Sequence, residues 1–307
     1  MIKISIITPI HNGEFFLETY INTLIESIKY TKEELEIECI LVDNNSTDNT
    51  LIQLNSLLKE IESPKNFQYL ILSYNEKPSS YASRNFGARY SNHRNLLFVD
   101  IDCIYPLNFF LKLKNRLDTL KETNFAIAGN IILKIRDNDN VFEQYDKAFG
   151  FNMKRYVAQK TGVTACAVFN RELFLKHKGF NELESGADRL FFKKVTKDKN
   201  VTFCFDKEIV MLHPCRNSKK MILQKTKRVS KGLGKINLSK NSLVKILFLL
   251  KNILGIFFPF HQIRVIIRIL RKKSKMNRDL KIKLVFYSIY FGSYARFNIC
   301  KTIIFNK

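Results

Sequence analysis

Residues 96–102 have the sequence LLFVDID, in which a short apolar run ends at two acids, Asp100 and Asp102. The run predicts a buried strand, and the two carboxylates leave its end with an i, i+2 spacing. Side chains spaced in this way can jointly face a divalent cation and the phosphates that it bridges. Because the same motif also occurs in solvated turns, its meaning depends on the sequence around it.

Strands and helices alternate before this stretch. Apolar runs predict strands at residues 2–8, 38–42 and 67–72. Helical patterns lie at residues 15–29 and 81–90, and Ser46 or Thr47 can cap a further helix that runs to about residue 58. Nearly continuous apolar strands between helices predict an open α/β sheet of mostly parallel strands flanked by helices. Ligands bind such a sheet outside the carboxyl ends of its strands. Those ends carry residues 8–12, 43–46 and 100–102, all of them polar stretches, so we predict a site there.

The second half of the chain has a more mixed pattern and an uneven charge. We predict helices near residues 107–121 and 186–196, and strands near residues 125–133, 164–169 and 209–213. Residues 216–307 hold 23 Lys and Arg against one acid, a charge of +22, whereas residues 1–215 hold 28 against 27, a charge of +1. We therefore predict a catalytic domain at residues 1–235 and a basic, apolar helical tail at residues 236–307. The six cysteines form no CxxC pair, which favours reduced thiols in the cytosol.

The tail contains two apolar runs, at residues 243–260 and 263–270, each interrupted by Lys or Arg. A nucleic-acid surface would place exposed aromatic residues among basic ones on a polar fold, so we expect no nucleic-acid partner. The longer run falls short of the roughly 20 apolar residues that cross a membrane. We predict helices that lie in an anionic membrane surface, with Lys and Arg meeting the head groups. Packing on the catalytic body or on a partner subunit is the alternative.

Other polar residues follow the first strands. The amide of Asn44 and the carboxylate of Asp43 can bond a pyrimidine edge, although a turn before a capped helix explains them too. The turn TPIHNG at residues 8–13 is not GxGxxG, which disfavours NAD or FAD. There His11 either stacks on a base or fills the turn. Arg84 is either a contact for a diphosphate or an exposed helix residue.

Taken in order, these segments resemble the family 2 glycosyltransferases of the GT-A fold. The matching motifs are SIITPIHNG (5–13), VDNNSTDNT (42–50), ASRNFGAR (82–89) and LLFVDIDCIYP (96–106), followed by Gly162-Val163 and by Gly186-Ala187-Asp188. The resemblance spans about residues 2–230. It implies a GT-A-like fold and an inverting, metal-dependent hexosyltransferase that takes its sugar from a nucleoside diphosphate.

The resemblance also implies roles for individual residues. Asp188 would be the catalytic base, and Asp102 with Asp100 would bind Mn²⁺ or Mg²⁺. His213 ends a predicted strand before Pro214, and it is either a third metal ligand or only a strand cap. The residues implied in nucleotide binding are Pro9, His11, Asn12, Asp43, Asn44, Arg84 and Asp100. Two alternatives stay open for Arg216, Lys225, Lys227 and Arg228: they contact the diphosphate from a mobile loop, or they form a solvated basic face.

Three positions depart from the family pattern: Ala187 replaces an acid before the base, Asn44 an acid in the nucleotide turn, and His11 a tyrosine. The donor base therefore stays open between UDP-, dTDP- and GDP-sugars. With the tail, the resemblance suggests a lipid-linked or cell-surface glycan as acceptor and a place at the cytoplasmic face of the cell membrane, peripheral or monotopic, in cell-envelope polysaccharide synthesis. A catalytically silent membrane scaffold and a nucleotidyltransferase are the alternatives.

Overall fold

The computed structural model describes residues 1–307 except 32–34, 121–123, 239–240, 259–266, 268–276 and 306–307. These residues form two compact units. The first unit comprises Met1–Ile132, Asn152–Leu183 and Ala187–Pro214, and the second comprises Leu133–Phe151, Glu184–Gly186 and Cys215–Lys307. The C-terminal segment of the second unit starts at Cys215, and two earlier segments belong to the same unit, so this division differs from the predicted one after residue 235.

In the part of the chain that the structure describes, the sheet has seven strands in the order β3-β2-β1-β4-β6-β5-β7. The strands are β1 (Ile2–Ile10), β2 (Leu35–Asp43), β3 (Phe67–Ser73), β4 (Asn95–Phe98), β5 (Asn124–Lys134), β6 (Ala167–Asn170) and β7 (Val201–Pro214). The first four strands pair in parallel, and β6 runs antiparallel to both β4 and β5. The carboxyl ends of β1, β2 and β4 consequently meet at one edge, as the sequence predicted.

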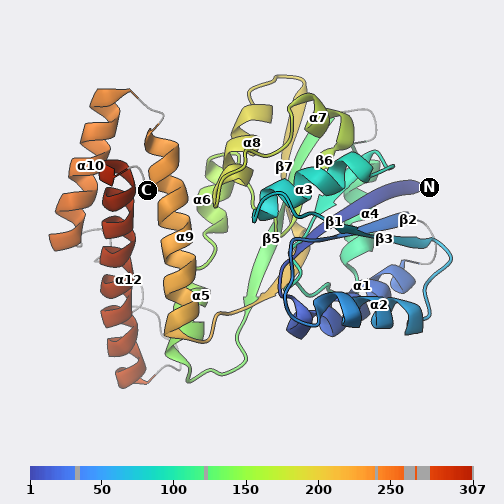
Figure 1. The fold of residues 1–307 in the computed structure, drawn as a ribbon, viewed down its shortest axis with the longest axis horizontal. Helices are drawn as coiled ribbons and strands as arrows, with labels where there is room; N and C mark the ends of the chain where they lie inside the picture. The colour runs from blue at the N-terminus through green and yellow to red at the C-terminus, as the bar shows by residue number, and fades with distance from the viewer. Residues whose placement is uncertain (32–34, 121–123, 239–240, 259–266, 268–276, 306–307) are drawn as a thin grey trace. The chain divides into compact units, whose positions relative to one another are not determined.

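Helices cover both faces of this sheet. In the first unit they are α1 (Glu14–Tyr30), α2 (Thr50–Glu60), α3 (Ser80–Tyr90), α4 (Phe109–Asp118), α6 (Met153–Ala158), α7 (Arg171–Lys176) and α8 (Ala187–Val195). Figure 1 shows α3 over one face of the sheet and α1 with α2 over the other. The fold is the predicted GT-A-like α/β arrangement of a sheet flanked by helices.

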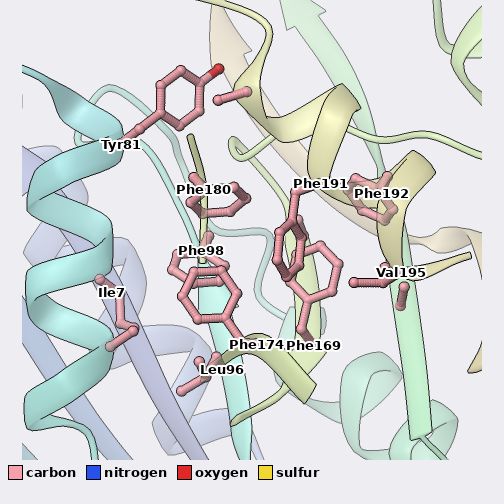
Figure 2. Packing of buried hydrophobic residues seen from close by; sticks show 14 of the residues in the cluster. Ile7, Tyr81, Leu96, Phe98, Phe169, Phe174, Phe180, Phe191, Phe192 and Val195 are labelled. Atoms are coloured by element: carbon pink, nitrogen blue, oxygen red, sulfur yellow. The ribbon is translucent and has the colours of Figure 1, made fainter. Parts of the chain in front are cut away.

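An aromatic cluster connects β4 to α8. Phe98 of β4 lies 5.0 Å from Phe174, ring centroid to centroid, and Phe174 lies 5.0 Å from Phe191 of α8. The ring centroid of Phe169 of β6 lies 4.7 Å from that of Phe192, and Figure 2 shows these rings packed at tilted angles between the strands and the helix. Because Phe98 precedes Asp100 and Phe191 follows Asp188, the cluster holds the two ends of the predicted site in place.

The second unit is helical, with α5 (Val141–Phe149), α9 (Lys219–Leu238), α10 (Ser242–Phe257) and α12 (Arg278–Phe305). Within it α12 packs against each of the other three helices. At Gly234 of α9 a Cβ would lie 2.7 Å from the Cβ of Thr302, so the close approach of α9 and α12 needs a glycine there. No helix in the described residues is both long and apolar enough to cross a membrane.

Several element boundaries differ from the predictions. Helix α2 begins at Thr50, not at Ser46 or Thr47, because the carboxylate of Asp48 accepts the backbone N–H of Thr50 at 3.1 Å. Strand β7 begins at Val201, well before the predicted strand. Residues 219–238 are a helix, so the mobile-loop alternative is wrong for Lys225, Lys227 and Arg228. The run at residues 263–270 lies outside the described residues, residue 267 aside.

Candidate active site

The loops after β1 and β2 bind each other at the sheet edge. Asn12 donates its backbone N–H to Ser46 Oγ at 2.9 Å, and its side-chain Oδ1 accepts the N–H of Thr47 at 2.8 Å. Asn12 and Asn45 both have positive φ, of 51° and 56°, a conformation that asparagine tolerates better than most residues. These contacts bring the predicted nucleotide-binding turns together into one rim, with Pro9 in register with Val42 on the neighbouring strand.

Three potential metal ligands converge beside this rim. Asp100, Asp102 and His213 each offer an atom that lies within 4.8 Å of those of the other two. An antiparallel bridge between Ile104 and Leu212 brings the end of β7 to the segment that follows β4. The structure thereby places His213 with the two acids, as the third-ligand interpretation required.

The imidazole of His213 is oriented by its own backbone neighbour. Its Nδ1 lies 2.7 Å from the carbonyl of Pro214, and because a carbonyl only accepts, Nδ1 is the donor. Its Nε2 then faces Asp102, 3.2 Å from the carboxylate. A ligand histidine needs this arrangement, in which one nitrogen is fixed by a carbonyl and the other is directed at the site. The donor set of two carboxylates and one imidazole suits Mn²⁺ and also Mg²⁺.

Arg84 is buried and not the exposed helix residue of the alternative interpretation. Its guanidinium forms an ion pair with Asp100 and also donates to the carbonyl of Ser80 at 3.2 Å. Its side chain is only 4% exposed, and its Nε is buried with no hydrogen-bond partner in the protein. An unsatisfied buried donor is costly, so an anion that accepts from it would relieve that cost.

Asp43 and Asn44 lie buried at the end of β2, but they differ in which hydrogen-bonding atoms remain without a partner in the protein. One oxygen of Asp43, Oδ1, is buried without a partner, while Oδ2 accepts the N–H of Ser46 at 3.3 Å. Both amide hydrogens of Asn44 are already used by the carbonyls of Tyr74 and Lys77, at 3.1 and 2.9 Å. The amide donors of Asn44 therefore hold the chain after β3 in place, and the prediction that its amide bonds a base remains open for the acceptor oxygen alone.

His11 forms part of the same rim. Its Nδ1 lies 2.8 Å from the backbone oxygen of Asn44, and its ring is exposed. The contact ties the turn after β1 to the turn after β2. The exposed ring leaves the base-stacking prediction for His11 open.

Asp188 lies buried in the first turn of α8. Its carboxylate accepts the N–H of Arg189 at 2.8 Å and that of Thr164 at 3.4 Å. Burial raises the pKa of Asp188, and the positive charges of Arg189 and Arg84 oppose the rise. The positive charge of Arg84 therefore stabilises the carboxylate of Asp188 as well as that of Asp100, which links the predicted base and the acidic pair electrostatically.

Sequence reasoning did not find two residues near Asp188. Thr164 donates its backbone N–H to Asp188, and Tyr156 is a partly buried residue whose pKa is raised by desolvation, with Arg189 and Asp188 among the charges acting on it. A backbone donor leaves no mark in the sequence, and Tyr156 lies in a stretch without a recognisable motif. Arg216 and Lys225 were candidates for contacting the diphosphate. In the structure both form ion pairs with Asp146 within the second unit, at 3.0 and 3.1 Å.

Comparison with a family model identifies the family of the chain. The family model Glycosyl transferase family 2 matches residues 5–177, more than half of the chain. The chain belongs to glycosyl transferase family 2. The matched residues of this family 2 transferase include the rim, Arg84 and both acids of the DxD motif. None of the curated proteins compared with the chain matches it.

Solved structures of transferases share the fold. The Staphylococcus aureus protein TarS (residues 1–349, in complex with UDP-GlcNAc) is 16% identical, with a TM-score of 0.51 over 100% of this chain and 93% of its own. The mannosyltransferase PcManGT from Pyrobaculum calidifontis, solved with GDP-Man and Mn²⁺, is 13% identical, with a TM-score of 0.62 over 99% of this chain and 87% of its own. At these identities the likeness concerns the fold.

Proposed function

We propose that this family 2 transferase moves a sugar from a nucleoside-diphosphate sugar to an acceptor hydroxyl, with inversion at the anomeric carbon. The observation that carries the proposal is the convergence of Asp100, Asp102 and His213 beside Arg84, whose charge also reaches the buried Asp188. The three potential metal ligands and Arg84 suit a diphosphate with its cation, and Asp188 offers a base.

The donor side would hold the nucleotide and a divalent cation. Asp100, Asp102 and His213 would bind Mn²⁺ or Mg²⁺, which when bound stabilises the negative charge on the departing diphosphate. The unpartnered Oδ1 of Asp43 can accept an N–H from the base of UDP, dTDP or GDP, and the Nε of Arg84 can donate to a phosphate. TarS and PcManGT bind a uridine and a guanosine nucleotide sugar respectively, which supports a donor of this class.

The acceptor side would use Asp188 as general base. An alcohol has a pKa far above neutrality, so a carboxylate must take its proton during attack. The raised pKa of Asp188 makes its carboxylate a stronger base than an exposed aspartate. A single base opposite the leaving group favours in-line displacement, which supports the proposal of inversion.

The acceptor and location are proposed from the tail. Leucines at i, i+4, i+7 and i+11 place one exposed apolar stripe along α10, formed by Leu243, Leu247, Leu250 and Leu254. Such a stripe beside basic residues suits insertion into the interface of an anionic membrane. We therefore propose a lipid-linked or cell-surface glycan as acceptor, at the cytoplasmic face of the membrane.

The decisive experiment is a screen of UDP-, dTDP- and GDP-sugars with Mn²⁺ or Mg²⁺, measured as released nucleoside diphosphate. We expect release with one donor class, dependent on the cation. A nucleotidyltransferase would instead release pyrophosphate from a nucleoside triphosphate, and a silent scaffold would release neither product. Either of these results, with protein that binds nucleotide, would contradict the proposed transfer.

A further inference from the structure

Asn85 of α3 joins this helix to the segment that precedes α8. Its side-chain amide donates to the carbonyl of Phe180 at 2.8 Å, and its Oδ1 accepts the backbone N–H of Phe180, also at 2.8 Å. One planar amide thus bonds both backbone groups of a single residue, which fixes that residue in position and in orientation. Asn85 lies in the motif at residues 82–89, but the proposed chemistry gives it no role. Both residues belong to the first unit.

The residue before Phe180 allows Asn85 to approach closely. Gly179 has a φ of 62°, which lies in the left-handed region that favours glycine. A Cβ at Gly179 would overlap Oδ1 of Asn85, so a larger residue would displace the amide or strain the backbone. The contact between α3 and this segment therefore depends on the glycine as well as on the two hydrogen bonds.

The Phe180 ring connects this contact to the helix that carries Asp188. Its centroid lies 5.2 Å from that of Phe191, and Figure 2 shows the ring between Tyr81 of α3 and Phe191 of α8. Phe191 is buried and lies about one helical turn after Asp188. Asn85 thus holds the backbone of Phe180, while the ring of Phe180 packs against the helix that presents Asp188.

The residue before Asn85 acts on the other half of the site. Arg84 forms an ion pair with Asp100, and its positive charge opposes the rise in the pKa of Asp188. Because Arg84 and Asn85 are neighbours in α3, one turn of this helix contacts the acidic pair and also holds the segment that packs on α8. Loss of the Asn85 contacts would therefore let Asp188 shift relative to Arg84 and Asp100. A displacement of about 1 Å can lower a reaction rate about a hundredfold.

We propose that Asn85 is a positioning residue, which holds Asp188 at its working distance from the donor side of the site. This inference rests on the proposed role of Asp188 as general base. Asn85 acts through Phe180 and α8 and not on the substrates themselves. Its loss should therefore lower kcat and leave nucleotide affinity unchanged.

The test is a double-mutant cycle on the full chain, measured as released nucleoside diphosphate. Asn85→Ala should lower kcat by about ten- to a hundredfold, with nucleotide affinity measured by calorimetry within about twofold. In the Asp188→Asn background the same change should lower kcat by no more than about twofold, because a base that is absent cannot be misplaced. A change that only destabilises the fold would act equally in both backgrounds.

Asn95→Ala is the matched control, because buried Asn95 also donates its side-chain amide to a backbone carbonyl, that of Lys3 at 2.8 Å. It should lower the unfolding temperature but change kcat by no more than about twofold in either background. Should Asn85→Ala not fold, Asn85→Ser replaces it with the same expectation.

Two failures are distinguishable in this cycle. Equal losses of kcat from Asn85→Ala in the two backgrounds, a loss no larger than that of Asn95→Ala, or a loss of nucleotide affinity in place of kcat would overturn the positioning role alone. Near-normal turnover in Asp188→Asn by itself would instead contradict the general base, and the positioning role would fall with it.

Discussion

Asp188 sits in surroundings that favour its protonated form. Burial raises its pKa, while Arg189 and Arg84 limit the rise, and only the carboxylate form can take a proton from an acceptor. We therefore expect kcat/KM to fall tenfold per pH unit as the pH drops through this raised pKa, above the value of about 3.9 for an exposed aspartate. The measurement is released diphosphate across the acid range. A profile that stays flat down to the ordinary aspartate range would contradict the assignment.

Replacing the carboxylate tests the same residue directly. Asp188→Asn keeps the size of the side chain but removes the base, so turnover should drop by about 10²- to 10⁴-fold. Nucleotide affinity, measured by calorimetry, should stay within about twofold because Asp188 is proposed to act on the acceptor. Asp139→Asn, at an exposed acid, is the matched control. Near-normal turnover in Asp188→Asn would remove Asp188 from the mechanism.

His213 is the ligand whose loss can be isolated most clearly. Its Nε2 faces Asp102 while its Nδ1 is held by the Pro214 carbonyl, so His213→Ala removes one directed donor and leaves both acids. We expect the Mn²⁺ affinity measured by calorimetry to fall by at least about tenfold. His93→Ala is the control, since His93 lies near Glu36 instead. An unchanged Mn²⁺ affinity in His213→Ala would show that the histidine only caps β7.

Individual residues were predictable to different degrees. The sequence indicates Asp100 and Asp102 because they directly follow an apolar strand. The grouping of His213 with them depends on the pairing of Ile104 with Leu212, and no local pattern reveals such a distant contact. Likewise, the amide N–H groups of Asn44 donate to the carbonyls of Tyr74 and Lys77, and only the structure shows that the backbone after β3 brings these carbonyls close to Asn44.

The strand and helix that carry the site depend on the aromatic cluster between them. Phe169 is fully buried against Phe192 and the rings around Phe98, so Phe169→Ala should lower the free energy of unfolding by about 3–5 kcal/mol. Urea unfolding measures this loss. Phe15→Ala, at a ring that is 77% exposed, should change the free energy by no more than about 0.5 kcal/mol. Equal small effects in both variants would mean that the cluster does not hold β4 and α8 together.

Elements with a strong periodic signal were predicted well, and those with a polar surface were not. The parallel strands β1, β2 and β3 are near-continuous apolar runs, which identifies them without the structure. The first residues of β7, VTFCF at 201–205, are of types that favour strands, but the charged residues Asp206, Lys207 and Glu208 then interrupt the apolar pattern, so only the run at 209–213 was predicted as a strand. Helix α9 is rich in lysine and is held by α12, a tertiary contact that the charge pattern alone does not predict.

The uneven charge of the chain bears on how it would reach its proposed acceptor. Nearly all of the excess, +22, lies in residues 216–307, and screening weakens such attraction at high salt. The exposed leucines of α10 act by burying apolar area, which salt does not weaken. Charge should therefore bring the full chain to anionic vesicles, and the apolar stripe should retain it there.

The two contributions separate in one sedimentation experiment. Leu247→Gln, Leu250→Gln and Leu254→Gln should leave low-salt vesicle binding within about fivefold, because the basic residues remain. After a high-salt wash the unmodified chain should stay bound until detergent is added, whereas this triple variant should be released. The side chains replaced are 50–60% exposed, so thermal unfolding should be unchanged. Ile52→Gln, at an exposed residue of α2, is the control and should behave like the unmodified chain. Release of the unmodified chain by salt alone would mean that attachment is electrostatic and that the α10 stripe does not insert.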